Sequence, residues 1–531
     1  MSELAKHDIE TGQTSLGVEF GSTRIKAVLI DSKYSPIAQG MFEWENQLEN
    51  GIWTYPEELI WEGLQTAYAE MAAEVKRTYH TELKTIGSIG FSAMMHGYMP
   101  FNAEGELLVP FRTWRNSITE QASVELTSLF NFNIPQRWSI AHLYQAILNQ
   151  EQHVKDIDFI TTLAGYVHWK VSGEKVLGIG DASGVFPIDM HTKNYDQSMV
   201  ERFDKLRSVQ QYHWQLSDIL PKVLAAGETA GVLTAAGARL LDPSGTLQAG
   251  ARLAAPEGDA GTGMVATNAV RVHTGNVSAG TSAFVMIVMD KPLSKWHSDI
   301  DIVTTPTGEL VAMVHANNSS SDINAWAKLF KEFADLLGVN ISTNELYAKL
   351  FNTILGADAD ADGLLTYGYY SGENITHMSE GRPLLARQPD SNFTIGNLMR
   401  ANLYSAFGAM KIGLEILADE QVETDSIVAA GGIFKTPVVA QKILAAVMEA
   451  PVTVMKTAGE GGPWGMAILA AYANGKSDQA LEDFLDREVF VDQESTTIFP
   501  DKRDIDGFNV FMDRYKAGLP IEAHAVLTLN N

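Results

Sequence analysis

Short apolar runs alternate with longer stretches of helical periodicity along most of this 531-residue chain. The short runs are typical of strands, and their alternation with helical patterns predicts the α/β class. Two long helices are predicted, over residues 321–338 and 395–417. In the second, Leu398, Ala401 and then Leu403 recur at helical spacing.

Two of the strand-like segments resemble each other. "EFGSTRIKAVLID" (19–31) and "NVSAGTSAFVMIVMD" (276–290) each place a Gly/Ser/Thr turn between a short apolar lead-in and an apolar run. Each reaches an Asp eight residues after its last hydroxyl, from Thr23 in the first segment and Ser282 in the second. Backbone N–H groups and hydroxyls in such turns can hold phosphate, although one turn alone would be an ordinary feature. The pair predicts a duplicated nucleotide-binding fold with a ligand cleft.

The length of the chain predicts two domains, because one hydrophobic core rarely organises more than about 300 residues. Residues 242–264 are rich in Gly, Ala and Pro, as expected where one domain passes to the next. We therefore expect an N-terminal domain over 1–262 and a C-terminal domain over 263–531.

Charge and composition exclude several classes of protein. The net charge of −26, from 39 Lys and Arg against 65 Asp and Glu, provides no broad basic surface for a nucleic acid. The absence of cysteine excludes disulfides, a thiol nucleophile and Cys-ligated metals. The polar start carries no secretory signal, and apolar runs such as 283–289 are too short for a bilayer. The sequence predicts a cytoplasmic protein with no membrane partner, and a homodimer is the commonest assembly.

Candidate chemistry concentrates around Asp259, which stands between glycines in "EGDAGTGM" (257–264). Flanking glycines let a ligand approach the carboxylate closely, although many such residues only form turns or cap helices. The overlapping "GTGMVA" (261–266) is a poor dinucleotide fingerprint, because no clear strand precedes it. A Gly-rich bend leading into a helix is the simpler interpretation.

Two further Gly-rich turns open helices late in the chain, in "AAGGIFKTPVVAQKIL" (429–444) and "AGEGGPWGMAILAA" (458–471). They fit a wall against which a base or ribose lies, and close helix packing explains the small residues equally well. Earlier, His96 in "SAMMHGYMPF" (92–101) precedes a glycine and the polar "TWRN" (113–116). It faces either the protein core or a ligand.

Nine motifs occur in one order between about residues 15 and 475. They are "EFGSTRIKAVLID", "MMHG", "TWRN", "GDASGVFPID", "GDAGTG", "SAGTSA", "YYSGEN", "AAGGIFKTPVVAQKIL" and "EGGPWGMAILAA". In this combination the chain resembles the FGGY carbohydrate kinases, and "MHG" is most similar to the xylulokinase branch.

The resemblance implies two domains of the ribonuclease-H-like fold shared with actin, Hsp70 and hexokinase, with ATP and a sugar in the cleft. It implies transfer of the γ-phosphate to a terminal hydroxyl of a ketopentose such as xylulose or ribulose, with Mg²⁺. By position, Asp259 matches the catalytic base and Glu19 the acid near the metal. The resemblance also assigns the sugar side to Met95, His96, Trp114 and Asn116, the first phosphate loop to Gly21, Ser22, Thr23 and Lys26, the second to Gly280, Thr281 and Ser282, and the adenosine side to Gly431, Gly432 and Lys435.

The chain departs from the family pattern in three respects, one of which is that the letters FGGY do not occur in it as a string. Glu19 stands where the family has Asp, and in "WRNSI" Asn116 and Ile118 replace an Asp and an Arg. Because this charge pair is lost, a second hypothesis stays open. The protein could instead be an actin- or Hsp70-like ATPase, or a sugar-responsive binding protein without turnover. A third hypothesis, a dinucleotide-dependent oxidoreductase, has the motif "GTGMVA" as its only support in the sequence.

Overall fold

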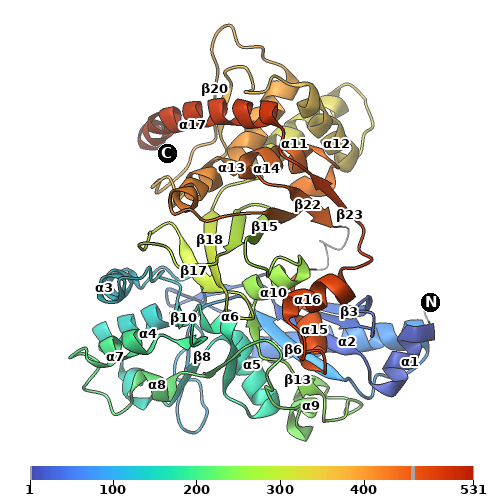
Figure 1. Cartoon of the computed structure of the whole chain (residues 1–531), viewed down its shortest axis with the longest axis vertical. Coiled ribbons are helices and arrows are strands. Elements are labelled where there is room, and N and C mark those ends of the chain that lie inside the picture. The colour runs from blue at the N-terminus through green and yellow to red at the C-terminus, as the bar shows by residue number, and fades with distance from the viewer. Residues whose placement is uncertain (1–2, 456–460, 530–531) are drawn as a thin grey trace. The chain divides into compact units, whose positions relative to one another are not determined.

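The structure is a computed structural model that describes residues 3–455 and 461–529 (Figure 1). The chain forms two compact units, and each is assembled from separate segments. Unit 1 comprises 1–271, 290–311 and 460–492, and unit 2 comprises 272–289, 312–459 and 493–531. Two contiguous domains divided after residue 262 remain a prediction.

The sheet of unit 1 has the strand order β13-β6-β1-β2-β3, and β14 also pairs with β6. β1, β2 and β3 are successive antiparallel neighbours, whereas β6 runs parallel to β1 and β14 runs parallel to β6. The bounds are β1 Ser15–Phe20, β2 Arg24–Ile30, β3 Pro36–Glu43, β6 Ser88–Ala93, β13 Arg252–Leu253 and β14 Glu257–Gly258.

Unit 2 repeats this arrangement, in the strand order β18-β16-β15-β21-β22-β23. β15 and β16 form an antiparallel hairpin, and β21 runs parallel to β15 just as β6 does to β1. The predicted duplication is therefore confirmed at the level of strand topology. The bounds are β15 Thr274–Ala279, β16 Ala283–Val288, β18 Leu310–Ala316, β21 Ser426–Ala430, β22 Val452–Met455 and β23 Ser495–Ile498.

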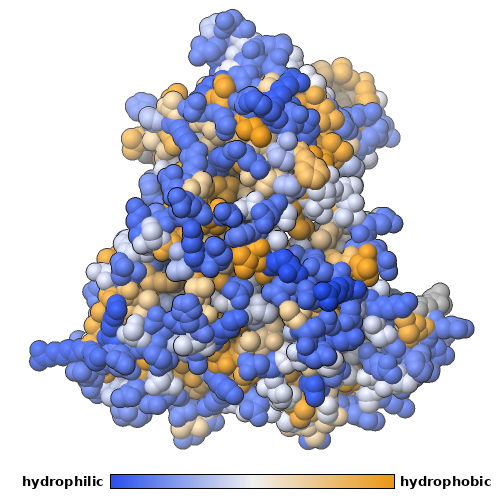
Figure 2. All heavy atoms as spheres, viewed as in Figure 1, coloured by the Kyte–Doolittle hydropathy of each residue, from blue (hydrophilic) through white to orange (hydrophobic). Residues whose placement is uncertain are grey.

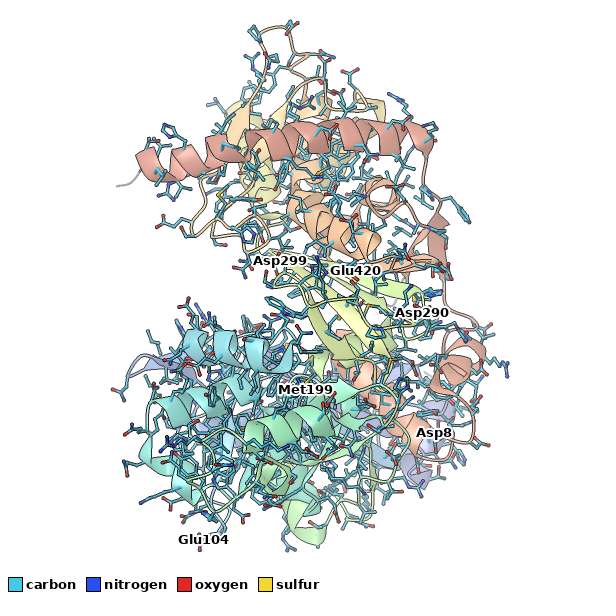
Figure 3. All side chains as sticks on the ribbon, turned by 60° about the vertical axis from the view of Figure 1, so that its left-hand side comes forward. Asp8, Glu104, Met199, Asp290, Asp299 and Glu420 are labelled. Carbon is cyan, nitrogen blue, oxygen red and sulfur yellow. The ribbon has the colours of Figure 1, made fainter. Side chains whose placement is uncertain are left out.

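Helices pack against each sheet. In unit 1, α2 (Glu57–Tyr79) packs against β3, and α15 (Gly461–Ala473) packs against β1 and β6. At the edge of the same unit, α1 (Glu3–Thr11) carries Asp8, which is labelled in Figure 3. Asp8 Oδ2 holds the helix in place by accepting a 2.8 Å bond from the Ser32 N–H. The sheet strands and α2 share one apolar core that includes Leu16, Val18 and Phe91.

The long helices of unit 2 lie close to their predicted places. α11 spans Ser321–Leu336 and α13 spans Ile395–Asp419. α11 ends two residues before the predicted limit, because Gly338 takes a φ of +72° and its N–H bonds back to Asp335 O. α14 (Val439–Met448) and α17 (Lys502–Thr528) complete the helical layer, with α17 in red in Figure 1.

Polar and charged side chains cover most of the face shown in Figure 2, as the net charge of −26 leads one to expect. Apolar side chains appear there in small groups. No helix in the described part of the chain is long and apolar enough to cross a membrane.

Candidate active site

In unit 1 the predicted site residues follow three parallel strands. The sheet register aligns Glu19 of β1 with Ser92 of β6, and Ser92 with Glu257 of β14. Because the carboxyl ends of parallel strands meet at one edge, the segments that follow these strands lie together. They carry the turn Gly21–Thr23, the segment Met95–Gly97 and Asp259, respectively.

The turn after β1 is braced from behind by two aromatic residues. Trp44 Nε1 donates to Gly21 O at 2.7 Å, the Trp44 N–H donates to Thr23 O at 3.1 Å, and Tyr55 OH donates to Ser22 O at 2.6 Å. The three carbonyls are therefore occupied. Within the described residues, the N–H groups of Ser22 and Thr23 have no protein acceptor, which is the arrangement of an anion-binding turn.

The second Gly/Ser/Thr turn, in unit 2, is built the same way. The N–H and Oγ of Ser320 donate to Gly280 O at 3.0 and 2.6 Å, and the Ser319 N–H donates to Thr281 O at 2.9 Å. Thr281 and Ser282 have no acceptor for their own N–H groups in the described part of the chain. Both turns thus present backbone donors outward.

Beside this second turn lies the Gly431–Gly432 segment, since β21 is the parallel neighbour of β15. Gly431 has a φ of +123°, and a Cβ there would lie 2.0 Å from Ala279 O, so glycine is required. Gly432 begins a short 3₁₀ turn that ends at Lys435, and a Cβ on Gly432 would meet open space. All three residues are exposed.

Asp259 is the first residue of α10 (Asp259–Ala266), directly after β14. Its Oδ1 accepts bonds from the N–H groups of Met95 at 3.1 Å and Ala260 at 3.0 Å. Desolvation by the surrounding protein raises the pKa of this carboxyl, although the residue keeps an exposed surface. "GTGMVA" is part of α10 itself rather than a loop before a helix.

Glu19 lies at the end of β1, opposite Lys26 of β2. Desolvation and the nearby charge of Asp259 raise the pKa of Glu19 to about 8, while Lys26 opposes this shift. Its Oε2 lies so close to the backbone of Gly462 that a Cβ there would be 1.6 Å away. Glu19, which is one methylene longer than the Asp of the family pattern, therefore fits because α15 begins with glycines. The motif "EGGPWG" alone did not indicate that Glu19 requires glycine at position 462.

His96 is buried and takes a φ of +71°, which is uncommon for a non-glycine residue and frequent at functional sites. Burial, and then the charge of Arg137, lower the pKa of His96 to about 3, so the ring is neutral. Its Nδ1 lies 3.2 Å from Gly184 O. A carbonyl can only accept, so Nδ1 carries the proton and Nε2 is left as an acceptor.

The segment that carries Trp114 and Asn116 lies beside His96, because Tyr98 and Arg112 form a bridge between the two segments. Trp114 is 40% exposed. Asn116 is buried, and its amide pairs with the backbone of Trp53, accepting from the N–H at 2.8 Å and donating to the carbonyl at 2.8 Å. Its second N–H bonds to Thr113 O, so both amide donors are used within the protein.

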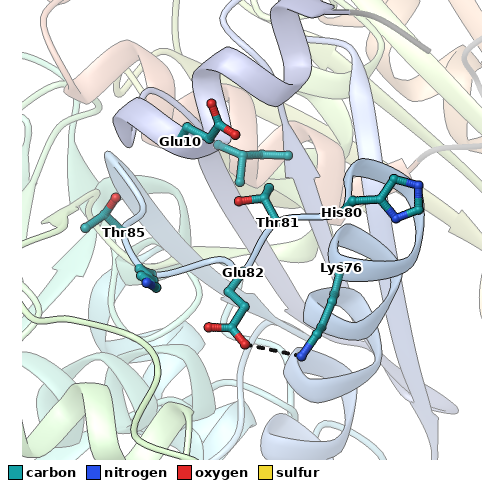
Figure 4. A pocket seen from close by; sticks show the side chains of 8 residues that line it. Glu10, Lys76, His80, Thr81, Glu82 and Thr85 are labelled. Atoms are coloured by element: carbon teal, nitrogen blue, oxygen red, sulfur yellow. Dashed lines mark hydrogen bonds and ion pairs between the residues drawn. The ribbon is translucent and has the colours of Figure 1, made fainter.

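None of the predicted site residues lines the surface pocket shown in Figure 4. That pocket, of about 550 Å³, lies between α1 and the C-terminal end of α2 and contains the 3.2 Å ion pair of Lys76 with Glu82. Among residues 3–455 and 461–529, no group of three or more His, Asp or Glu side chains converges as a metal site.

Comparison with known proteins identifies the class to which this fold and these loops belong. Residues 14–245 match the N-terminal domain of the FGGY family of carbohydrate kinases, and residues 275–474 match its C-terminal domain. The chain therefore belongs to the FGGY family and is a carbohydrate kinase with the two-domain actin/hexokinase-like fold. ATP is the phosphoryl donor of this family.

Individual relatives are distant but cover almost the whole chain. A xylulose kinase from Haemophilus influenzae is 22% identical over 513 residues, which are 94% of this chain and 98% of the relative. The crystal structure of xylulose kinase from Rhodospirillum rubrum matches with a TM-score of 0.77 at 18% identity, covering 97% and 99% of the two chains. A gluconate kinase from Lactobacillus acidophilus also matches with a TM-score of 0.77, at 16% identity and with 96% and 98% covered.

Proposed function

We propose that this kinase transfers the γ-phosphoryl group of ATP to a terminal hydroxyl of a ketopentose such as xylulose or ribulose. The observation that carries the proposal is the bond from the Met95 N–H to Asp259 Oδ1, which joins the acid to the segment bearing His96. Curated relatives named xylulose kinase support the choice of a ketopentose.

On the sugar side, Asp259 accepts the proton of the attacking hydroxyl, as a general base needs only hydrogen-bond reach to that oxygen. His96 Nε2 accepts a bond from another sugar hydroxyl, because its neutral ring has no proton there. Met95 and Trp114 provide apolar surface. Asn116 acts indirectly, by fixing the Trp114 segment to the backbone of Trp53.

On the nucleotide side, the two braced turns hold phosphate oxygens through their outward N–H groups. Gly21, Ser22 and Thr23 form one of these sites, and Gly280, Thr281 and Ser282 form the other. Adenosine lies against the bare backbone of Gly431 and Gly432, with Lys435 nearby.

Glu19 fits the role of a magnesium ligand, directly or through water. A carboxylate oxygen is a preferred donor for Mg²⁺, which usually binds one or two carboxylates together with substrate phosphates. The mutual repulsion that helps to raise the pKa of Glu19 beside Asp259 is the repulsion that a cation relieves. When bound, Mg²⁺ supplies neutralisation of charge on the phosphate oxygens.

The test is ADP release coupled to NADH oxidation, with Mg·ATP and a panel of sugars. The panel contains D- and L-xylulose, D- and L-ribulose, L-fuculose, gluconate, glycerol, erythritol and a control without sugar. We expect a rate that rises with one or two ketopentoses. Equal slow release in every sample would instead indicate an ATPase or a sugar-responsive binding protein, and a response to gluconate or glycerol alone would refute the ketopentose.

A further inference from the structure

A second buried carboxylate lies two residues before Asp259. Glu257 is 1% exposed, and its two oxygens accept bonds from the start of α6 (Ile179–Ala182). Oε1 accepts from the Gly180 N–H at 3.3 Å and Oε2 from the Asp181 N–H at 3.0 Å. This side chain, together with the 2.7 Å backbone bond from the Gly178 N–H to Pro256 O, fastens the β14 segment to the start of α6.

Three glycines make room for this carboxylate: Gly178 at the end of β9 (Val176–Gly178), Gly180 in α6 and Gly261 in α10. A Cβ at Gly178 would lie 2.2 Å from Glu257 Oε1, and one at Gly180 would lie 2.4 Å from Oε2. On α10, a Cβ at Gly261 would lie 3.3 Å from Oε2. The carboxylate of Glu257 is thus enclosed by backbone from the end of β9, from α6 and from α10, and it has little freedom to move.

Asp181 completes the arrangement. It is 1% exposed, and its Oδ2 accepts a 2.6 Å bond from Thr162 Oγ1, whereas its buried Oδ1 has no partner among the described residues. That Oδ1 lies 3.4 Å from the position of a Cβ on Gly258, the residue between Glu257 and Asp259. Both carboxyl groups therefore border the junction of β14 and α10.

Burial raises the pKa of Asp181 to about 7 and that of Glu257 to about 8. The charge of Asp259 raises the first further, and the charge of Asp181 raises the second, while bonds from Thr162 and from backbone N–H groups oppose these shifts. Burial and the neighbouring charges therefore both disfavour the ionised form of these two carboxyl groups.

We propose that Glu257 and Asp181 are positioning residues that hold Asp259 in place by locking the β14–α10 junction to α6. The inference rests on the role proposed above for Asp259. Only Gly258 separates Glu257 from Asp259, so a displaced Glu257 carries the acid with it. A misplacement of about 1 Å at a reacting group can lower the rate by about 100-fold.

The first test is Glu257→Gln, whose amide nitrogen would face one of the two N–H donors and break that bond. We expect kcat to fall by about 10- to 100-fold. The KM values for sugar and ATP should stay within about threefold, because no binding group is removed. Asp181→Asn, which keeps its contact with Thr162, should lower kcat less.

Asp242→Asn is the matched control. Asp242 is also a buried acid of unit 1 that accepts backbone bonds, from Ser244 at 3.1 Å and Leu247 at 2.8 Å, but it lies in the turn after α9 (Ala235–Leu241). It should lower thermal stability and leave kcat unchanged. A Glu257→Gln enzyme with kcat within twofold of the wild type would overturn the inference.

Hydrogen–deuterium exchange provides a readout that needs no turnover. In Glu257→Gln, the amides of α6 and α10 should exchange at least about tenfold faster, and those of α2 should not change. Faster exchange in a protein that phosphorylates no sugar would support the role of Glu257 in holding the β14–α10 junction, and would refute only the assignment as a kinase. Unchanged exchange together with unchanged kcat, in an active kinase, would refute only the proposed positioning role of Glu257. Faster exchange throughout unit 1 would also refute it, because the residue would then be a general stabiliser.

Discussion

The position of Glu19 depends on the lack of a side chain at Gly462, in the first turn of α15. A Cβ at Gly462 would lie 1.6 Å from Glu19 Oε2, 2.7 Å from Glu19 Cδ and 3.0 Å from Thr262 Oγ1. Since an ordinary carbon–oxygen contact is about 3.3 Å, the carboxylate must retreat by roughly 1.7 Å in Gly462→Ala. The acid would then leave the place from which it is proposed to serve the metal.

The expected cost to activity is much larger than the cost to stability. The clashing atoms are the end of a flexible side chain, so rotation of Glu19 should limit the loss of unfolding free energy to about 1 kcal/mol, or 2–4 °C in Tm. A shift of this size at a group near the transferred phosphate should lower kcat by about 100-fold. Gly356→Ala is the control, because a Cβ there would meet no atom within 4 Å.

A second substitution tests whether the clash with Glu19 causes the loss of activity in Gly462→Ala. Glu19→Asp shortens the side chain by one carbon–carbon bond, about 1.5 Å, and should relieve the clash. The double variant Glu19→Asp, Gly462→Ala should therefore be more active than Gly462→Ala alone when ADP release is measured at saturating sugar and Mg·ATP. The reasoning is refuted if Gly462→Ala keeps a kcat within about threefold of the wild type, or if the shorter acid does not restore activity.

Because the pKa of Glu19 is raised to about 8, Mg²⁺ affinity measured by calorimetry with ATP present should increase as the pH rises through 8, and Glu19→Gln should abolish this dependence. The stability gained by keeping this acid protonated in the metal-free protein is complete below its ordinary pKa of 4.5 and is lost as the pH rises through 8. Gly431→Ala should raise the KM for ATP at least about tenfold, equivalent to 1.4 kcal/mol, by pushing the loop off Ala279 O, while the sugar KM hardly changes; equal changes in both would contradict this. In unit 2, Asp504→Asn removes the carboxylate charge that pairs at 3.2 Å with buried Arg400 and with Lys442, and urea unfolding should show a loss of about 3 kcal/mol in unfolding free energy. A loss below about 1 kcal/mol would show that the pair adds little.

The sequence was informative wherever function depends on a local pattern. The hairpins at 19–31 and 276–290 and the glycines at 431 and 432 could be predicted, because turn chemistry and strand periodicity are local properties. The parallel strand beside each hairpin then brings the predicted loops to one edge of its sheet.

Other features depend on contacts between distant segments, which a single sequence does not display. Nothing in "EGD" indicates that Glu257 lies among glycines 77 and more residues earlier, at the start of α6. Nothing in "WRNSI" indicates that the side-chain amide of Asn116 donates both of its hydrogen bonds to backbone carbonyls. The packing of 460–492 into unit 1, which places Gly462 against Glu19, likewise depends on contacts between segments far apart in the sequence.

The most direct test of the central claim is the ³¹P NMR spectrum of the product formed from Mg·ATP and the best ketopentose, with wild-type protein and with Asp259→Asn. The account predicts one new phosphate monoester, a triplet coupled to the two protons of a terminal CH₂, from the wild type. It predicts no ester from Asp259→Asn, although that variant should still bind ATP. A doublet would place the phosphate on a secondary hydroxyl, inorganic phosphate alone would show an ATPase, and an active Asp259→Asn would remove Asp259 as the base.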